Sequence, residues 1–184
     1  MKPNTDSLSR EENILLESWL NGNKRILIIT GAVNSGKTTL ANKIADEFKD
    51  FGFNVKGFLS KGIFSGEDKT GYKLINISTG DEYHLASINP GKKFKLRQGR
   101  LFFNEEVFET ADKLLKHLST DDIILLDEIG PLEIKEKGFY SSLKEILSSL
   151  NNKVILIVRE KLIKDILTKF NLLRNEIDII RIEN

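Results

Sequence analysis

The stretch Gly31-Ala-Val-Asn-Ser-Gly-Lys-Thr-Thr39 decides the fold, because it is a complete Gly-x-x-x-x-Gly-Lys-Thr phosphate-binding loop. It follows Arg25-Ile-Leu-Ile-Ile-Thr30, an apolar and β-branched run that predicts a buried strand. It precedes residues 40–50, whose apolar side chains recur on one helical face. A loop placed between a strand and a helix indicates a nucleoside-triphosphate site rather than an ordinary glycine-rich turn.

The residue types of the loop suit this chemistry. Gly31 and Gly36 allow the backbone to fold back, so that successive N–H groups point at a polyphosphate. The N-terminus of the following helix adds partial positive charge. Lys37 can reach the β- and γ-phosphates and act in catalysis, and Thr38 offers a hydroxyl to Mg²⁺. We expect the nucleotide (ATP, GTP or another NTP) to be bound by Gly31, Ala32, Val33, Asn34, Ser35, Gly36, Lys37, Thr38 and Thr39.

Length and composition limit the other possibilities. The chain has 184 residues, which predicts one domain, and its 28 basic and 27 acidic residues leave a net charge of +1. No bulk charge therefore favours a membrane or a nucleic acid, and no clear nucleic-acid site is indicated. Without cysteine there is no disulfide and no thiolate metal site. No apolar run approaches the roughly 18 residues of a membrane span, so we expect a cytoplasmic protein. Nothing identifies a protein partner.

Strands alternate with helices along the chain, which favours an α/β fold. We expect a three-layer P-loop NTPase fold, with a mostly parallel sheet, helices on both faces and an antiparallel hairpin insertion near residues 55–90. Ser9 and Glu12 have capping-box spacing, so residues 1–24 are expected to be a helical extension docked on a domain of residues 25–184. The expected strands are 25–30, 54–64, 72–77, 82–86, 123–126, 153–158 and 177–182, and the later helices 105–118, 139–150 and 162–170.

A second motif ends a buried strand with two carboxylates, in Ile123-Ile-Leu-Leu-Asp-Glu128. In P-loop folds an aspartate at such a strand end holds Mg²⁺, which neutralises charge on the β- and γ-phosphates. We assign this role to Asp127. Glu128 is then placed to orient or deprotonate an attacking water. The alternative is a polar strand end before the turn at Gly130-Pro131, but a complete phosphate loop in the same chain favours the functional interpretation.

The segment Asp127-Glu-Ile-Gly-Pro-Leu-Glu133 resembles the D-E-I-G-x-x-E segment of a small family of P-loop nucleoside-triphosphatases. That family is typified by a thermophile enzyme and a human cancer-related relative. Residues 24–184 share further features with it: Gly57-Phe58, Gly71-Tyr72, Thr79-Gly80 and Phe103-Asn-Glu-Glu-Val-Phe108. The resemblance implies Mg²⁺-dependent hydrolysis of NTPs to NDP and phosphate, with loose base selectivity.

Arg159 directly follows the strand expected at residues 153–158. If that strand lies between the phosphate-loop strand and the Asp127 strand, Arg159 comes close to the γ-phosphate and can act there as an arginine finger in cis. The alternative is a strand-end arginine paired with Glu160 or with a helix C-terminus.

Two further stretches leave alternatives open. Glu133 either lies near the metal's water shell or ribose, or is a surface carboxylate beside Lys135 and Lys137. The basic residues 92–100, which include Arg97 and Arg100, form either a mobile lid over the phosphates or a solvated loop.

Hydrolysis of NTPs is the favoured function, and two alternatives remain. A nucleoside or small-metabolite kinase would use the same loop, with Glu128 deprotonating an acceptor hydroxyl, although nothing in the sequence marks an acceptor site. A slow nucleotide-binding module would instead regulate a partner. A guanine-specific switch is disfavoured, because Thr168-Lys-Phe-Asn171 has asparagine where the base-reading aspartate is required.

Overall fold

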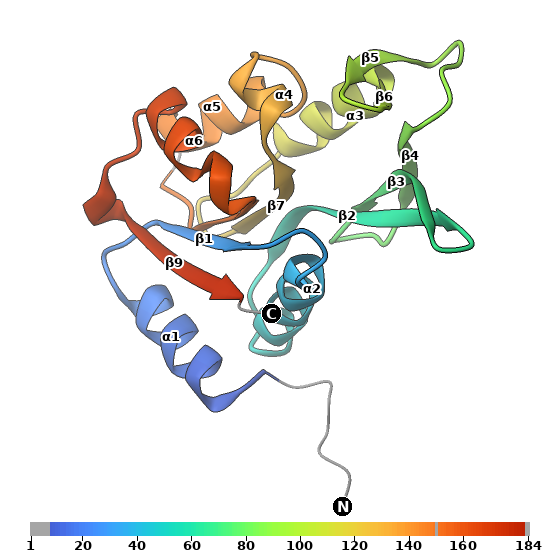
Figure 1. The fold of residues 1–184 in the computed structure, drawn as a ribbon. Helices are drawn as coiled ribbons and strands as arrows, with labels where there is room; N and C mark the ends of the chain where they lie inside the picture. The colour runs from blue at the N-terminus through green and yellow to red at the C-terminus, as the bar shows by residue number, and fades with distance from the viewer. Residues whose placement is uncertain (1–7, 150, 183–184) are drawn as a thin grey trace, which may run out of the picture.

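The computed structural model describes residues 8–149 and 151–182, which form one sheet covered by helices on both faces (Figure 1). The helices are α1 (Arg10–Asn21), α2 (Lys37–Asp50), α3 (Glu105–Leu115), α4 (Pro131–Ile134), α5 (Tyr140–Ser149) and α6 (Ile163–Lys169). The strands are β1 (Ile26–Gly31), β2 (Val55–Ser65), β3 (Asp68–Asn76), β4 (Glu82–Ser87), β5 (Phe94–Gln98), β6 (Leu101–Asn104), β7 (Ile123–Ile129), β8 (Val154–Val158) and β9 (Ile177–Ile182). Their order in the sheet is β5-β6-β4-β3-β2-β7-β8-β1-β9. The α/β fold with helices in both outer layers is confirmed.

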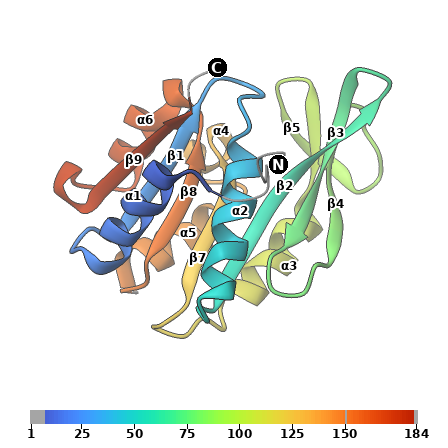
Figure 2. The same ribbon diagram turned by 90° about the horizontal axis from the view of Figure 1, so that it is seen from below.

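Five strands, β2, β7, β8, β1 and β9, pair in parallel. Ile28 of β1 lies between Leu156 of β8 and Ile179 of β9. These strands are nearly continuous apolar runs because helices cover both of their faces; all five residues of β8 are buried. Figure 2 shows α1 and α2 on one face, and α3, α4, α5 and α6 cover the other. The carboxyl ends of β1, β7 and β8 therefore meet at one edge, where α/β folds bind their ligands.

The antiparallel part of the sheet is larger than the sequence suggested. Strands β3, β4, β6 and β5 extend it beyond β2, so antiparallel pairing continues to Asn104 instead of ending near residue 90. The interpretation of residues 92–100 as a solvated loop is wrong, because residues 94–98 are strand β5, and the interpretation as a lid over the phosphates stays a prediction. Leu96 is buried between exposed Lys95 and Arg97, the period-two pattern of a half-covered strand. The density of basic residues concealed this alternation.

Helix α1 begins at the capping box that Ser9 and Glu12 predicted. The Ser9 N–H donates to Glu12 Oε2 at 2.7 Å, and the Glu12 N–H donates to Ser9 Oγ at 3.2 Å. Trp19 is 1% exposed and lies 6.2 Å from Phe48 of α2, ring centroid to ring centroid. Lys153 donates to the carbonyl of Trp19 at 2.6 Å, which holds the end of α1 against the start of β8. The division into a 1–24 extension and a 25–184 domain stays a prediction, and residues 1–7, 150 and 183–184 lie outside the described part of the chain.

Candidate active site

The phosphate-binding loop connects β1 to α2, as its sequence context predicted. Gly31 has a φ of 150°, and a Cβ there would lie 2.7 Å from the Ile182 carbonyl oxygen and 2.8 Å from Ser35 Oγ. Gly36, at the N-terminus of α2, has a left-handed φ of 89°. Both positions therefore require glycine for steric or conformational reasons. The resulting loop wraps around the start of α2.

The Lys37 side chain folds back over this loop. Its Nζ donates to the carbonyl oxygens of Gly31, at 3.2 Å, and Ala32, and to Ser35 Oγ at 3.4 Å. Burial lowers the pKa of Lys37, an effect that the nearby Glu128 opposes. The ammonium group thus lies inside the loop, where a β- or γ-phosphate would meet it.

Thr38 and Asp127 are in direct contact. Thr38 Oγ1 donates to Asp127 Oδ2 at 2.8 Å, and the Asp127 carboxylate also accepts the N–H groups of Ser60 at 3.0 Å and Glu128 at 2.7 Å. Asp127 is only 1% exposed. Burial, reinforced by the charge of Glu128, raises the pKa of Asp127 to about 6, although its three hydrogen bonds act in the opposite direction. The contact joins the start of α2 to the end of β7.

This pair of oxygen donors fits Mg²⁺. Magnesium prefers hard oxygen ligands and keeps several waters, so one hydroxyl, one carboxylate and the phosphates of a nucleotide form a normal set. Within residues 8–149 and 151–182 there is no group of three or more His, Cys, Asp or Glu side chains that could hold a metal.

Glu128 has an unusual backbone conformation at the end of β7. Its φ of 59° is left-handed, and the pairing of β7 with β8 changes register between Leu126 and Ile129. Such strain in a residue other than glycine is uncommon and occurs most often at functional sites. The consequence is that Asp127 stays buried while the Glu128 side chain remains 36% exposed at the edge of the sheet.

Arg159 reaches the site from the neighbouring strand. Strand β8 lies between β1 and β7, which is the arrangement that the prediction for Arg159 required. An Arg159 guanidinium nitrogen lies 3.2 Å from Glu128 Oε2. The alternative pairing with Glu160 is not found, because Glu160 lies 3.5 Å from Arg181 instead. The end of β8 thus brings a cation to the carboxylate at the end of β7.

Comparison with known proteins identifies the family. The family model described as NTPase matches residues 26–184. This chain belongs to the NTPase family. The resemblance inferred from the D-E-I-G-x-x-E segment is confirmed.

Relatives and solved structures agree with this assignment. The "Nucleoside-triphosphatase THEP1" proteins of Methanocaldococcus jannaschii and Pyrococcus abyssi are each 35% identical over 123 residues, which cover 67% and 66% of this chain and 72% and 67% of theirs. The solution structure of a human cancer-related nucleoside triphosphatase matches 87% of this chain and 89% of its own, with a TM-score of 0.68 and 22% identity. The crystal structure of THEP1 from Aquifex aeolicus matches 85% and 89%, with a TM-score of 0.67 and 24% identity. At this identity the two structures support the fold of this NTPase.

Glu133 of this NTPase is not a surface carboxylate, whereas its role near the metal's water shell or ribose stays a prediction. It is 2% exposed, and its two oxygens accept the N–H groups of Gly130 at 2.8 Å and Phe139 at 3.0 Å. Burial raises the pKa of Glu133 to about 7, in spite of these hydrogen bonds. The interpretation that placed it on the surface beside Lys135 and Lys137 is wrong.

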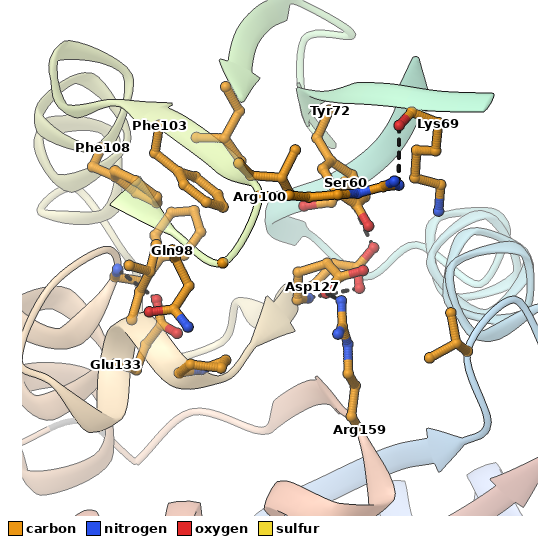
Figure 3. A pocket seen from close by; sticks show the side chains of 18 of the residues that line it. Ser60, Lys69, Tyr72, Gln98, Arg100, Phe103, Phe108, Asp127, Glu133 and Arg159 are labelled. Atoms are coloured by element: carbon orange, nitrogen blue, oxygen red, sulfur yellow. Dashed lines mark hydrogen bonds and ion pairs between the residues drawn. The ribbon is translucent and has the colours of Figure 1, made fainter. Parts of the chain in front are cut away.

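A cavity of about 390 Å³ adjoins the loop (Figure 3). Its lining includes three polar residues that sequence reasoning did not assign to the site: Lys69, Tyr72 and Gln98. Lys69 Nζ donates to Asn34 Oδ1 in the phosphate loop at 3.2 Å, and Arg100 donates to the Lys69 carbonyl at 3.1 Å. Of the two arginines in the basic stretch, Arg100 therefore belongs to the site, whereas Arg97 packs on Phe102 at 5.7 Å. Nothing in the sequence indicated that Lys69 belongs to the site, because it lies in a segment that was predicted to be a turn.

Across the described residues, no helix is long and apolar enough to cross a membrane.

Proposed function

We propose that this NTPase hydrolyses nucleoside triphosphates to nucleoside diphosphate and phosphate, in a reaction that depends on Mg²⁺ and has loose base selectivity. The observation that carries the proposal is the convergence of Lys37, the Thr38–Asp127 pair and the Glu128–Arg159 pair at the carboxyl ends of β1, β7 and β8. The curated relatives named nucleoside-triphosphatases support the same reaction class.

The loop residues Gly31–Thr39 bind the triphosphate. Lys37 leaves the loop carbonyls that it contacts and donates to the β- and γ-phosphates, because a phosphate oxygen is a stronger acceptor for an ammonium group than a neutral carbonyl. Thr38 and Asp127 hold Mg²⁺, which neutralises phosphate charge when bound. Asp127 is suited to hold it through water, since its buried oxygens already accept two backbone N–H groups.

Glu128 is the group that accepts a proton from the attacking water. Its carboxylate is accessible, it directly follows the Mg²⁺-binding Asp127, and its left-handed backbone turns it away from the buried path of β7. Arg159 holds this carboxylate in the resting state and can transfer its contact to the γ-phosphate, where charge develops during transfer. Lys37 and Arg159 then both stabilise the negative charge that develops on the γ-phosphate in the transition state.

Loose base selectivity is supported by what the sequence lacks. A guanine-specific site needs an aspartate that pairs with the base edge, and the nearest match, Thr168-Lys-Phe-Asn171, has no aspartate. The recognised part of the substrate is then the triphosphate, which all four common nucleotides share.

The test is phosphate release from ATP, GTP, CTP and UTP with Mg²⁺, beside an EDTA control. Glu128→Gln is expected to bind Mg²⁺–NTP and to release phosphate about 100-fold more slowly, the usual size of a general-base effect. Glu160→Gln is the matched control, because it removes the same charge next to Arg159, from an exposed residue that pairs with Arg181. Full activity in Glu128→Gln, or release that persists in EDTA, would contradict the proposal.

A further inference from the structure

The cavity beside the phosphate loop is larger and more apolar than hydrolysis by water requires. A water molecule needs room for one small oxygen, whereas about 390 Å³ lies within the range of sites that bind small organic molecules. The space is therefore large enough for part of a second ligand beside the triphosphate.

The cavity borders only one side of the phosphate loop. It is bordered by Val33 and Asn34 in the first half of the loop and by Asp127, Glu128 and Arg159. It is not bordered by Lys37, Thr38 or Thr39, the first residues of α2. The cavity therefore lies beside the proposed base, Glu128, and Arg159, on the side from which a group would attack the terminal phosphate in the proposed reaction.

The chemistry of the walls changes along the cavity. Lys69, Arg100 and Arg159 lie at the phosphate end, and Phe103 and Phe108 lie at the far end, as Figure 3 shows. The two rings are stacked with centroids 6.1 Å apart, and Phe108 meets Phe139 edge-on at 5.1 Å. A cluster of aromatic side chains beside an empty volume is suited to the face of a planar ring.

Polar groups with unused hydrogen-bonding capacity lie between these ends. Ser60 is 4% exposed, and its Oγ has no hydrogen-bond partner among the described residues although it lies in the cavity wall. A buried hydroxyl without a partner is costly, and because the Oγ is itself buried, a ligand group in the cavity completes it only if the Ser60 side chain turns toward the opening. Each oxygen of Glu133 accepts one backbone N–H and has a further lone pair for a ring N–H. Gln98, whose Oε1 accepts from Lys135 Nζ at 2.8 Å, adds its amide N–H groups to the same wall.

We infer that this cavity binds a second ligand of the nucleoside class, and that its hydroxyl group accepts the terminal phosphoryl group of the bound NTP. The ring lies among Phe103, Phe108 and Phe139, and the sugar lies beside Ser60 and Tyr72 with one hydroxyl facing Glu128. The inference rests on the proposed function, because it uses the same phosphate loop and the same base.

The transfer step is balanced without any further reactant. A lone pair of the acceptor hydroxyl attacks the γ-phosphorus, and the bond from that phosphorus to the β–γ bridging oxygen breaks. The nucleoside diphosphate leaves with the electron pair of that bond. The hydroxyl proton passes to the Glu128 carboxylate and then to solvent, and the products are a nucleoside monophosphate and a nucleoside diphosphate. Water takes the place of the hydroxyl when the cavity holds no acceptor.

The experiment incubates the full chain with Mg²⁺ and ATP labelled on its terminal phosphate, together with adenosine, guanosine, cytidine or uridine. Labelled phosphate and labelled nucleoside monophosphate are separated by chromatography and counted. Leu101→Trp places a large side chain in the cavity from strand β6, where Leu101 is only half-buried. Phe102→Trp is the matched control, because Phe102 is the next residue on the same strand and faces the other side of the sheet.

We expect labelled nucleoside monophosphate from at least one nucleoside. The ratio of transfer to hydrolysis should fall at least about tenfold in Leu101→Trp and remain at the wild-type value in Phe102→Trp. Phe103→Leu keeps an apolar side chain and removes a stacking ring, so it should lower the same ratio. It provides an independent test if the Leu101→Trp variant does not fold. Circular dichroism of each variant checks the fold directly.

Other results would overturn the inference in distinguishable ways. Phosphate release without any labelled nucleoside would remove the acceptor site and leave the hydrolase standing. A Leu101→Trp variant that raises the KM for every NTP, with transfer unaffected, would show that the cavity holds the nucleotide's own base. The absence of both products would remove the proposed function together with the inference.

Discussion

The buried carboxylate of Glu133 predicts that its contribution to the free energy of unfolding falls with rising pH, which is unusual for an acidic residue. Its carboxylate is buried, and the structure provides two backbone N–H donors for it but no cation in direct contact among the described residues. The pKa of Glu133 is about 7 in the folded chain, against an ordinary value of 4.5 that applies to the unfolded chain. Between these two values the folded state binds more protons than the unfolded state. The contribution of Glu133 to the free energy of unfolding therefore falls as pH rises through this window and is constant on either side of it.

The magnitude follows from the difference between the two pKa values. About 2.5 pKa units correspond to about 3 kcal/mol of unfolding free energy. Glu133→Gln carries no charge at any pH, but its amide nitrogen cannot accept an N–H, so the variant keeps only one of the two hydrogen bonds from Gly130 and Phe139. That loss lowers its stability by an amount that does not change with pH. The difference in unfolding free energy between variant and wild type should therefore move in favour of the variant by about 3 kcal/mol between about pH 4 and about pH 8. Asp127, whose raised pKa acts in the same direction, is present in both proteins and cancels from the comparison.

Urea unfolding at several pH values, followed by the fluorescence of the single tryptophan, measures this difference. Trp19 is 1% exposed in the fold, so its emission reports unfolding directly. Glu109→Gln removes a carboxylate from an exposed position of α3 and serves as the control, for which no trend of this size is expected. The reasoning is refuted if the difference between wild type and Glu133→Gln stays constant from the acidic to the alkaline end.

Three further predictions concern the loop, the arginine and the first helix. Lys37→Ala should weaken the binding of Mg²⁺–NTP about tenfold or more in an equilibrium titration, because the ammonium group that would contact the phosphates is lost, while the melting temperature changes little. Unchanged affinity would contradict this role of Lys37. Arg159→Ala should lower kcat about 100-fold and alter KM much less in steady-state kinetics, since its contact with phosphate develops during transfer; wild-type kinetics would leave Arg159 a purely structural partner of Glu128. Trp19→Ala should reduce the free energy of unfolding by about 3 kcal/mol or more in circular-dichroism denaturation, because it empties the space between α1 and Phe48; a negligible loss would mean that α1 contributes little to the fold.

The parts of the site that could be predicted from the sequence depend on short, fixed spacings. The loop from Gly31 to Thr39 lies between a strand and a helix that are recognisable themselves, so its fixed residues Gly31, Gly36, Lys37 and Thr38 are enough to predict its geometry. Asp127 and Glu128 were identifiable because an apolar strand ends in them. Arg159 needed one further step, the position of β8 between β1 and β7, which the alternation of strands and helices made available.

The parts that could not be predicted depend on contacts between distant segments. Lys69 reaches Asn34 only because the β2–β3 hairpin extends over the loop, and its position in the sequence says nothing about that approach. Strand β5 was hidden by the charges that surround Leu96. Glu133 is buried because α4 and the backbone at Phe139 enclose it, although its neighbours in the sequence are lysines.

The backbone conformation of Glu128 lowers the stability of the fold, whereas its side chain serves the proposed reaction. A φ of 59° is the conformation that glycine adopts without strain and that costs any other residue about 1 kcal/mol or more. Glycine at this position would thus make the chain more stable, and it would at the same time remove the carboxylate that the proposed reaction needs. Selection for stability alone would favour glycine at this turn, and the proposed reaction supplies a reason for the glutamate that the fold does not.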